Sequence, residues 1–201
     1  TQDDAAEFGT RHSSNAGSMT GLAVAAANTD VWVKAANSET GNDFWYSEDR
    51  GVTWSNKVTA PVSGQNGHGG SVAISADGST FYWAPGNMAF VFWSDDKGKT
   101  WNQSEGGMSA KRLIADPVNP DYLYAASGST FYYSDDRGKT FTANSELSVF
   151  TSTRPVVEAG VEGKIYYPAM GLQVSTDHGK TFTHLSTVSN CQMVGLGTVS
   201  Y

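Results

Sequence analysis

Apolar and polar residues alternate along most of this chain in short runs, which is the pattern of half-buried β-strands. Several of these runs are strongly aromatic and are followed by turn residues, namely residues 44–46 (FWY), 90–93 (FVFW) and 131–133 (FYY). Further strand–turn–strand patterns occupy residues 23–36, 72–85, 113–126 and 158–170. No window of about 12 residues carries the 3.6-residue period of an amphipathic helix. The chain is therefore predicted to be all-β.

An eight-residue box occurs four times, directly after an aromatic or β-branched run. The copies follow the pattern S-x-D-x-G-K/V-T-W/F and start at residues 47, 94, 134 and 175, with spacings of 47, 40 and 41 residues. This period matches one four-stranded blade of a β-propeller. We expect blades at residues 19–62, 66–108, 109–149 and 150–187. Residues 1–18 are expected to form an N-terminal segment or incomplete blade, and residues 188–201 to start a further blade.

The residue types of the box predict a structural role. Its Asp can accept backbone N–H bonds inside a tight turn, and its Gly can supply a positive φ. The last residue of each copy is a large aromatic, and burial between neighbouring sheets would remove about 150–250 Å² of each from water. These residues are Trp54, Trp101, Phe141 and Phe182. The box is therefore expected to fasten hairpins and not to catalyse.

Charge and composition narrow the class of protein further. The chain has 201 residues, 13 basic and 20 acidic, and a formal net charge of −7. Without a basic cluster it is not expected to bind nucleic acid. Its longest apolar run, residues 21–27, is much shorter than the roughly 20 residues of a membrane helix. The Gly-, Ser-, Thr- and Asn-rich surface is typical of secreted β-proteins, and the single cysteine, Cys191, is expected to be a buried thiol.

Several common catalytic and metal-binding patterns are missing from the sequence. It contains no G-x-S-x-G nucleophile elbow and no H-E-x-x-H zinc motif. Its four histidines are scattered singly, and the boxes lack the oxygen spacing of a calcium loop. No metal ion and no cofactor is expected.

The segments between the boxes carry a second signal, because several differ from blade to blade and occur in a characteristic order. They are residues 70–78 (GSVAISADG), 83–85 (WAP), 115–120 (ADPVNP), 122–125 (YLYA), 160–163 (GVEG), 171–182 (GLQVSTDHGKTF) and 194–197 (VGLG). The box itself resembles the Asp-box of sialidases, sortilin-type receptors and several secreted glycosidases. Over nearly the whole chain, the order of segments resembles the C-terminal propeller of glycoside hydrolase family 74, the xyloglucanases.

The resemblance implies a fold and a reaction. Members of that family have two seven-bladed propellers with a cleft between them for the β-1,4-glucan backbone of xyloglucan, which they hydrolyse with inversion. Inversion needs two carboxyl groups about 6.5–9.5 Å apart, and in this family each propeller supplies one aspartate. A chain of about four and a half blades would hold at most one of them. The candidate is Asp4, whose spacing to Phe8 matches the family's Gly-Asp-x-x-Gly-Phe-type segment although the flanking glycines are absent.

Other residues are candidates for substrate contact. Trp83 ends a predicted strand where the family lines its cleft, and an exposed indole there would stack on a sugar ring. Asn87 lies in the loop that follows, and His68 lies in a glycine-rich loop where it could donate to a sugar hydroxyl. Arg154 and Tyr167, each next to a proline, complete the set.

The leading hypothesis is a part of a secreted xyloglucan hydrolase that forms one wall of the cleft. Its expected partners are plant cell-wall polysaccharide and either the missing propeller domain or a second copy of the chain. One alternative is a non-catalytic carbohydrate-binding propeller, and another is a structural or receptor-binding Asp-box module. A sialidase-like module would need three arginines around a carboxylate, and the boxes leave only Arg11, Arg112 and Arg154.

Overall fold

The computed structural model describes residues 16–38, 43–55, 61, 68–106, 108, 110, 112–148, 153–169, 171–189 and 191–196. These residues form strands, turns and irregular loops, and none of them is helical. The strands are β1 (Ala16–Val24), β2 (Trp32–Ser38), β3 (Phe44–Ser47), β4 (Ser71–Ile74), β5 (Phe81–Ala84), β6 (Phe92–Ser94), β7 (Asn102–Gln103), β8 (Arg112–Ala115), β9 (Leu123–Ser127), β10 (Thr130–Ser134), β11 (Thr142–Ser148), β12 (Val156–Val157), β13 (Ile165–Ala169), β14 (Gly171–Ser175) and β15 (Thr183–Leu185). In this part of the chain no helix is available that could cross a membrane. The all-β prediction is confirmed.

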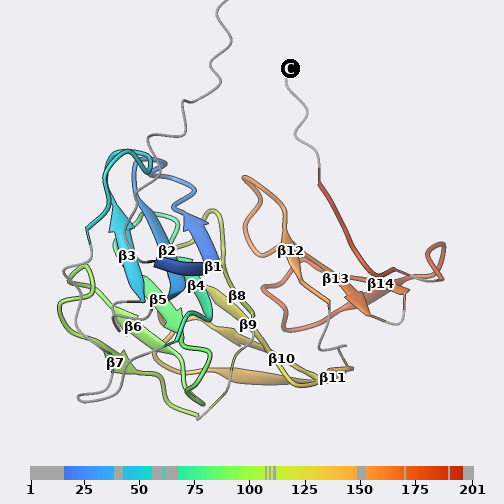
Figure 1. Cartoon of the computed structure of the whole chain (residues 1–201). Helices are drawn as coiled ribbons and strands as arrows, with labels where there is room; N and C mark the ends of the chain where they lie inside the picture. Colours follow the sequence, from blue (N-terminus) through green and yellow to red (C-terminus); the bar gives the residue numbers. More distant parts are fainter. Residues whose placement is uncertain are drawn as a thin grey trace, which may run out of the picture.

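The strands form four antiparallel sheets, each made of consecutive segments of the chain (Figure 1). The first sheet has the order β1-β2-β3, and an isolated bridge between Tyr46 and Ser55 adds a fourth position to it. The others have four strands each, in the orders β4-β5-β6-β7, β8-β9-β10-β11 and β12-β13-β14-β15. The strands of these four sheets span residues 16–47, 71–103, 112–148 and 156–185. The described residues between 188 and 196 form no strand.

Three apolar cores lie between successive sheets. Val33 and Phe44 of the first sheet pack with Ile74 and Trp83 of the second. Equivalent clusters form between the second and third sheets and between the third and fourth. Residues 72–74 show how one strand serves two cores, because Val72 and Ile74 face the first core and Ala73 faces the second. Stacked sheets that alternate in this way form a propeller.

Three of the four box aromatics insert between sheets as predicted. Trp101 packs on the first core, Phe141 on the second and Phe182 on the third. The Trp101 ring meets Phe44 edge-on, with 5.0 Å between ring centroids. Trp54 directly precedes Ser55 of the Tyr46–Ser55 bridge and contacts a cation instead, since the Lys34 Nζ lies 4.1 Å from its ring centroid.

The box geometry explains its residue types. In the first copy the Ser47 hydroxyl donates to Asp49 Oδ1 over 2.7 Å, and the Gly51 N–H donates to the Ser47 hydroxyl oxygen over 2.9 Å. Thr53 donates its N–H to Oδ1 and its hydroxyl to Oδ2 of Asp49, over 2.8 and 2.6 Å. The same bonds recur around the other three box aspartates. The structural role of the box is thus accounted for within the turn itself.

The sequence had indicated one positive φ per box, and the structure has two. The residue before the glycine also adopts the left-handed conformation, with φ of 58° at Arg50 and 63° at Arg137. Both side chains pair with an acidic residue of the first turn of their own blade, Arg50 with Asp30 at 2.6 Å and Arg137 with Asp121 at 2.8 Å. These two arginines are therefore engaged at the boxes, as the sequence analysis expected.

The second and third blades are each also hydrogen-bonded to the box of the blade that follows. The hydroxyl of Ser104, three residues after one box, donates to the carbonyl of Gly138 in the next. At the equivalent place Asn144 donates its Nδ2 hydrogens to the carbonyls of Gly179 and Lys180, over 2.9 and 3.0 Å. Because both side chains are buried, these bonds fix the register between neighbouring sheets.

Candidate functional site

The first strands of the blades surround a pocket. β1, β4, β8 and β12 each lie at an edge of their sheet, and β1 packs on β4 and β4 on β8. The pocket has a volume of about 870 Å³ and is lined from all four of these strands and from the segments that enter them. A cavity of this size, walled by apolar side chains with a few polar groups, is suited to a ligand of several rings.

The strand register places this pocket away from the boxes. Ser71, at the start of β4, pairs with Ala84 at the end of β5, whereas Phe81 at the start of β5 pairs with Ser94, the first residue of a box. The pocket and the box of this blade therefore lie at opposite ends of the sheet. Residues at the pocket end therefore take no part in the hydrogen bonds of the box turn.

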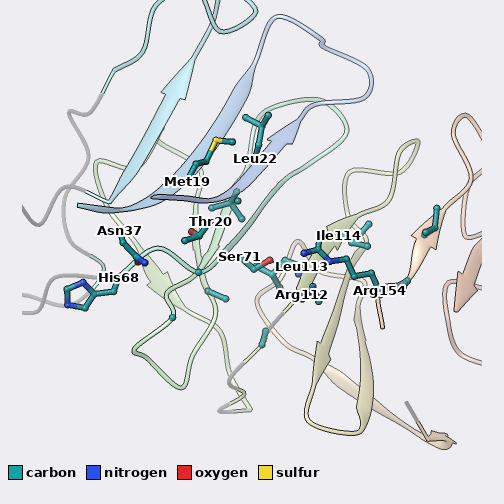
Figure 2. Close-up of a pocket in the computed structure, with 18 of the residues that line it drawn as sticks. Met19, Thr20, Leu22, Asn37, His68, Ser71, Arg112, Leu113, Ile114 and Arg154 are labelled. Carbon is teal, nitrogen blue, oxygen red and sulfur yellow. Dashed lines mark hydrogen bonds between the residues drawn. The ribbon is translucent and has the colours of Figure 1, made fainter. Parts of the chain in front are cut away.

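The two ends of the pocket differ in character (Figure 2). Asn37 and His68 lie at one end, and Arg112 and Arg154 lie at the other. Between them β1 contributes the exposed apolar side chains of Met19 and Leu22, and the segment after the fourth blade contributes Gln192 and Met193. Sugar rings present both C–H faces and hydroxyl edges, and apolar walls with polar ends match both features.

His68 is held at the rim by its backbone. Its N–H donates to Asn87 Oδ1 over 3.0 Å, and its carbonyl accepts from the Gly86 N–H over 2.8 Å. Gly70 has φ of 95°, and a Cβ there would collide with the carbonyl oxygen of Ala84. This tight backbone leaves the His68 ring exposed and accessible from the pocket. Asn87 acts here as a positioning residue, because its amide oxygen is occupied by His68.

Trp83 is a core residue, contrary to the expectation that it stacks on a sugar. Its side chain belongs to the first apolar core with only 2% of the residue exposed, and its Nε1–H donates to the Gly69 carbonyl over 2.7 Å. Its ring lies 5.4 Å from that of Phe44 and 5.8 Å from that of Trp101, measured between centroids. The indole thus holds the backbone next to His68 through this bond, and it is too deeply buried for a ligand to stack on it.

The last two candidates occupy different environments. Arg154 is exposed and lines the pocket. Tyr167 on β13 is fully buried, and burial raises the pKa of its phenol above the ordinary value of 10.0. Its ring packs edge-on against Phe131, 5.8 Å away between centroids. Tyr167 is therefore part of the third core and does not reach the pocket.

The structure adds residues that the sequence did not single out as contacts. Arg112 was weighed only as one of the arginines outside the boxes, and it lines the pocket beside Leu113. Asp43 is buried with 1% exposure, and its Oδ2 lies 3.7 Å from Nδ1 of His68. An aspartate just before a strand is common in loops, so the sequence gives no sign that Asp43 lies near His68. Only the packing of the first two blades reveals the Asp43–His68 pair.

The catalytic candidate Asp4 lies outside the described residues, as does Arg11. Among the described residues no group of three His, Cys, Asp or Glu side chains could hold a metal ion. Cys191 is only partly buried, and its Sγ–H contacts the carbonyl of Met193 at 3.4 Å. The expectation of a buried thiol was wrong, because Cys191 belongs to none of the three cores and precedes residues 192–194, which line the pocket.

The fold and the boxes show to which class of protein the chain belongs. The family description BNR/Asp-box repeat matches residues 132–143, which cover the whole third box, residues 134–141, and the end of the strand before it. A glycoside hydrolase family 74 enzyme from Niastella koreensis superposes with a TM-score of 0.71 and 28% identity, covering 86% of this chain and 25% of the other. The family 74 xyloglucanase of Xanthomonas campestris gives a TM-score of 0.68 and 26% identity, covering 83% and 25%. The chain is an Asp-box β-propeller segment.

Sequence similarity then specifies the family. A xyloglucanase of a Paenibacillus species is 31% identical over 199 residues, covering 92% of this chain and 19% of the relative. A xyloglucanase of Hypocrea jecorina is 34% identical over 172 residues, covering 84% and 20%. This chain is homologous to one segment of the xyloglucanases of glycoside hydrolase family 74. It spans about a fifth of the length of these relatives.

Proposed function

We propose that this chain is part of a secreted glycoside hydrolase that cleaves the β-1,4-glucan backbone of xyloglucan with inversion, and that its pocket lies in one wall of the substrate cleft. The observation that carries the proposal is the 31–34% identity to xyloglucanases over most of this chain. The pocket supports it, because it combines apolar side chains with the exposed polar groups of His68 and Arg154.

In the proposed mechanism, the pocket residues bind the substrate and two carboxyl groups carry out the hydrolysis. The pocket residues would hold the glucan backbone or its side branches, with His68 donating to a hydroxyl and Met19 and Leu22 covering a C–H face. Asp4 would supply one of the two carboxyl groups, either as acid to the leaving oxygen or as base to the attacking water. The second carboxyl group would come from another propeller domain or from a second copy.

Binding is the direct test of the cleft-wall role. Titration of the 201-residue chain with a xyloglucan heptasaccharide, followed calorimetrically, should give a measurable Kd that weakens about tenfold in His68→Ala. His184→Ala is the matched control, because His184 is an exposed histidine on β15 that does not line the pocket. A heptasaccharide affinity that is unaffected in the His68 variant, or no binding by the parent chain, would contradict the proposal.

Catalysis is tested separately by reducing-end release from xyloglucan, with mixed-linkage glucan as the comparison substrate and Asp4→Asn as the variant. Release that disappears in the variant supports a catalytic role for Asp4. Binding without release favours the second candidate, a non-catalytic carbohydrate-binding propeller. That candidate is kept because the chain spans only about a fifth of the xyloglucanases it matches.

A further inference from the structure

One end of the pocket carries positive charge in a chain whose net charge is −7. Arg112 and Arg154 both line it there, and no Asp or Glu stands among the described residues of the lining. A neutral glucan backbone gives such a pair of guanidinium groups only hydroxyls to bind. An anionic ligand group would instead give both guanidinium groups charge-assisted hydrogen bonds, which are about twice as strong as neutral ones.

The two arginines come from neighbouring blades and converge on one place. Arg112 begins β8, and Arg154 precedes β12 and extends toward β8 (Figure 2). Ser71 fixes the neighbouring strand, since its hydroxyl oxygen accepts the Leu113 N–H over 2.9 Å and so ties β4 to β8 beside Arg112. Burial and the nearby Arg154 charge both lower the pKa of Arg112 below its ordinary value.

Two like charges this close repel each other in a partly dehydrated setting, and an anion placed between them would relieve the repulsion. The planar guanidinium group matches the two oxygens of a carboxylate particularly well, and each Arg can donate two parallel N–H bonds. Arg50 and Arg137, in contrast, are paired near the boxes with Asp30 and Asp121.

We propose that the Arg112–Arg154 end of the pocket binds the carboxylate of a uronic acid, so that the chain takes an acidic saccharide. The sugar ring carrying the carboxylate would lie against Leu113 and the apolar side chains of β1, and the rest of the saccharide would extend toward His68 and Asn37. The inference shares with the proposed function only the premise that the pocket binds saccharides.

The test uses two disaccharides that differ only in one group. Cellobiouronic acid carries a carboxylate where cellobiose carries a hydroxymethyl group. At pH 7 and low salt the 201-residue chain should bind the acid at least tenfold more tightly than cellobiose in calorimetric or NMR titration. The ratio should fall to near one in Arg154→Gln and in Arg112→Gln. Since Arg154 is exposed, its replacement leaves the cores intact, and circular dichroism verifies the fold.

Arg50→Gln is the matched control, because it removes an arginine at a box, away from the pocket, and should leave the tenfold ratio unchanged. Equal affinities of the parent chain for both disaccharides would overturn the inference, as would a preference for the acid that survives both pocket variants. If xyloglucan heptasaccharide still binds in that case, the proposed function stands without it. Failure to bind any of the three saccharides would refute both.

Discussion

Replacing Asp116 by asparagine tests how the third and fourth blades are joined. Asp116 is 1% exposed, and its carboxylate accepts four hydrogen bonds. Oδ1 accepts the N–H groups of Val118 and Asn119, both over 2.9 Å. Oδ2 accepts the Tyr124 hydroxyl over 2.7 Å and, from the neighbouring blade, the Gly163 N–H over 2.8 Å.

An asparagine keeps one acceptor and turns the other position into an NH₂ donor. The Tyr124 hydroxyl can rotate to accept from that group, but the Gly163 N–H cannot, and it is left buried without its acceptor. The loss of one buried partner and of the charge on the remaining bonds amounts to about 2–4 kcal/mol. For a chain of this size that is a fall in Tm of roughly 5–15 °C.

Thermal unfolding followed by tryptophan fluorescence and circular dichroism measures this fall. Tyr124→Phe removes one of the four bonds and should lower the stability by only about 1 kcal/mol. Asp135→Asn, at an exposed box position, should change it by less than about 0.5 kcal/mol. An Asp116→Asn chain that melts within about 2 °C of the parent would refute the reasoning that this carboxylate joins the blades.

Three further predictions concern the backbone next to His68, the boxes and the thiol of Cys191. Gly70→Ala should lower the free energy of unfolding by about 1–3 kcal/mol and weaken saccharide binding, because φ of 95° is unfavourable for alanine and the new Cβ would meet the Ala84 carbonyl. The control is Gly128→Ala, where φ is 58° and the space is open, and it should lower the free energy of unfolding, measured in urea, by less. Equal effects of the two variants would contradict this prediction. The Thr53 hydroxyl, the Thr53 N–H and the Ser47 hydroxyl lower the pKa of Asp49 from 3.8 to about 2, so its contribution to stability is complete above pH 4 and is lost as the pH falls toward 2; the decline in Tm over that range should be shallower in Asp49→Asn. The thiol of Cys191, partly exposed beside the pocket residue Met193, should react with a thiol reagent, and a bound saccharide should slow the reaction; an unchanged rate with saturating ligand would place the ligand elsewhere.

Much of the fold could be predicted from the sequence because the box is a local structure. Its serine, aspartate, glycine and threonine bond to one another within a few residues, so their spacing alone specifies the turn. Four such turns at blade-length intervals then fix the number and order of the sheets. The position of an aromatic such as Trp101 follows from the box in the same way.

The candidate site was less predictable, because its residues meet only after the blades pack. Trp83 and Tyr167 each stand close to a proline in the sequence, where a strand could end and a contact residue could lie. Only the packing of neighbouring sheets shows that both are buried. Arg112 and Arg154 lie in different blades, and their proximity depends on the inner strands. A signal was present in the repeat register, since both stand at or just before the first strand of a blade.

The bonds from Ser104 and Asn144 to the following boxes have a consequence for how such a molecule can grow. Each fastening is made by a residue three places after one box and the backbone of the next box, so it needs nothing specific from the receiving side chains. A duplicated blade therefore brings both the side chain that bonds to the next box and the backbone carbonyls that accept the bond from the blade before it. Gene duplication can lengthen the array without redesigning the existing joints, and the side chains around the axis can diverge while the outer turns stay the same.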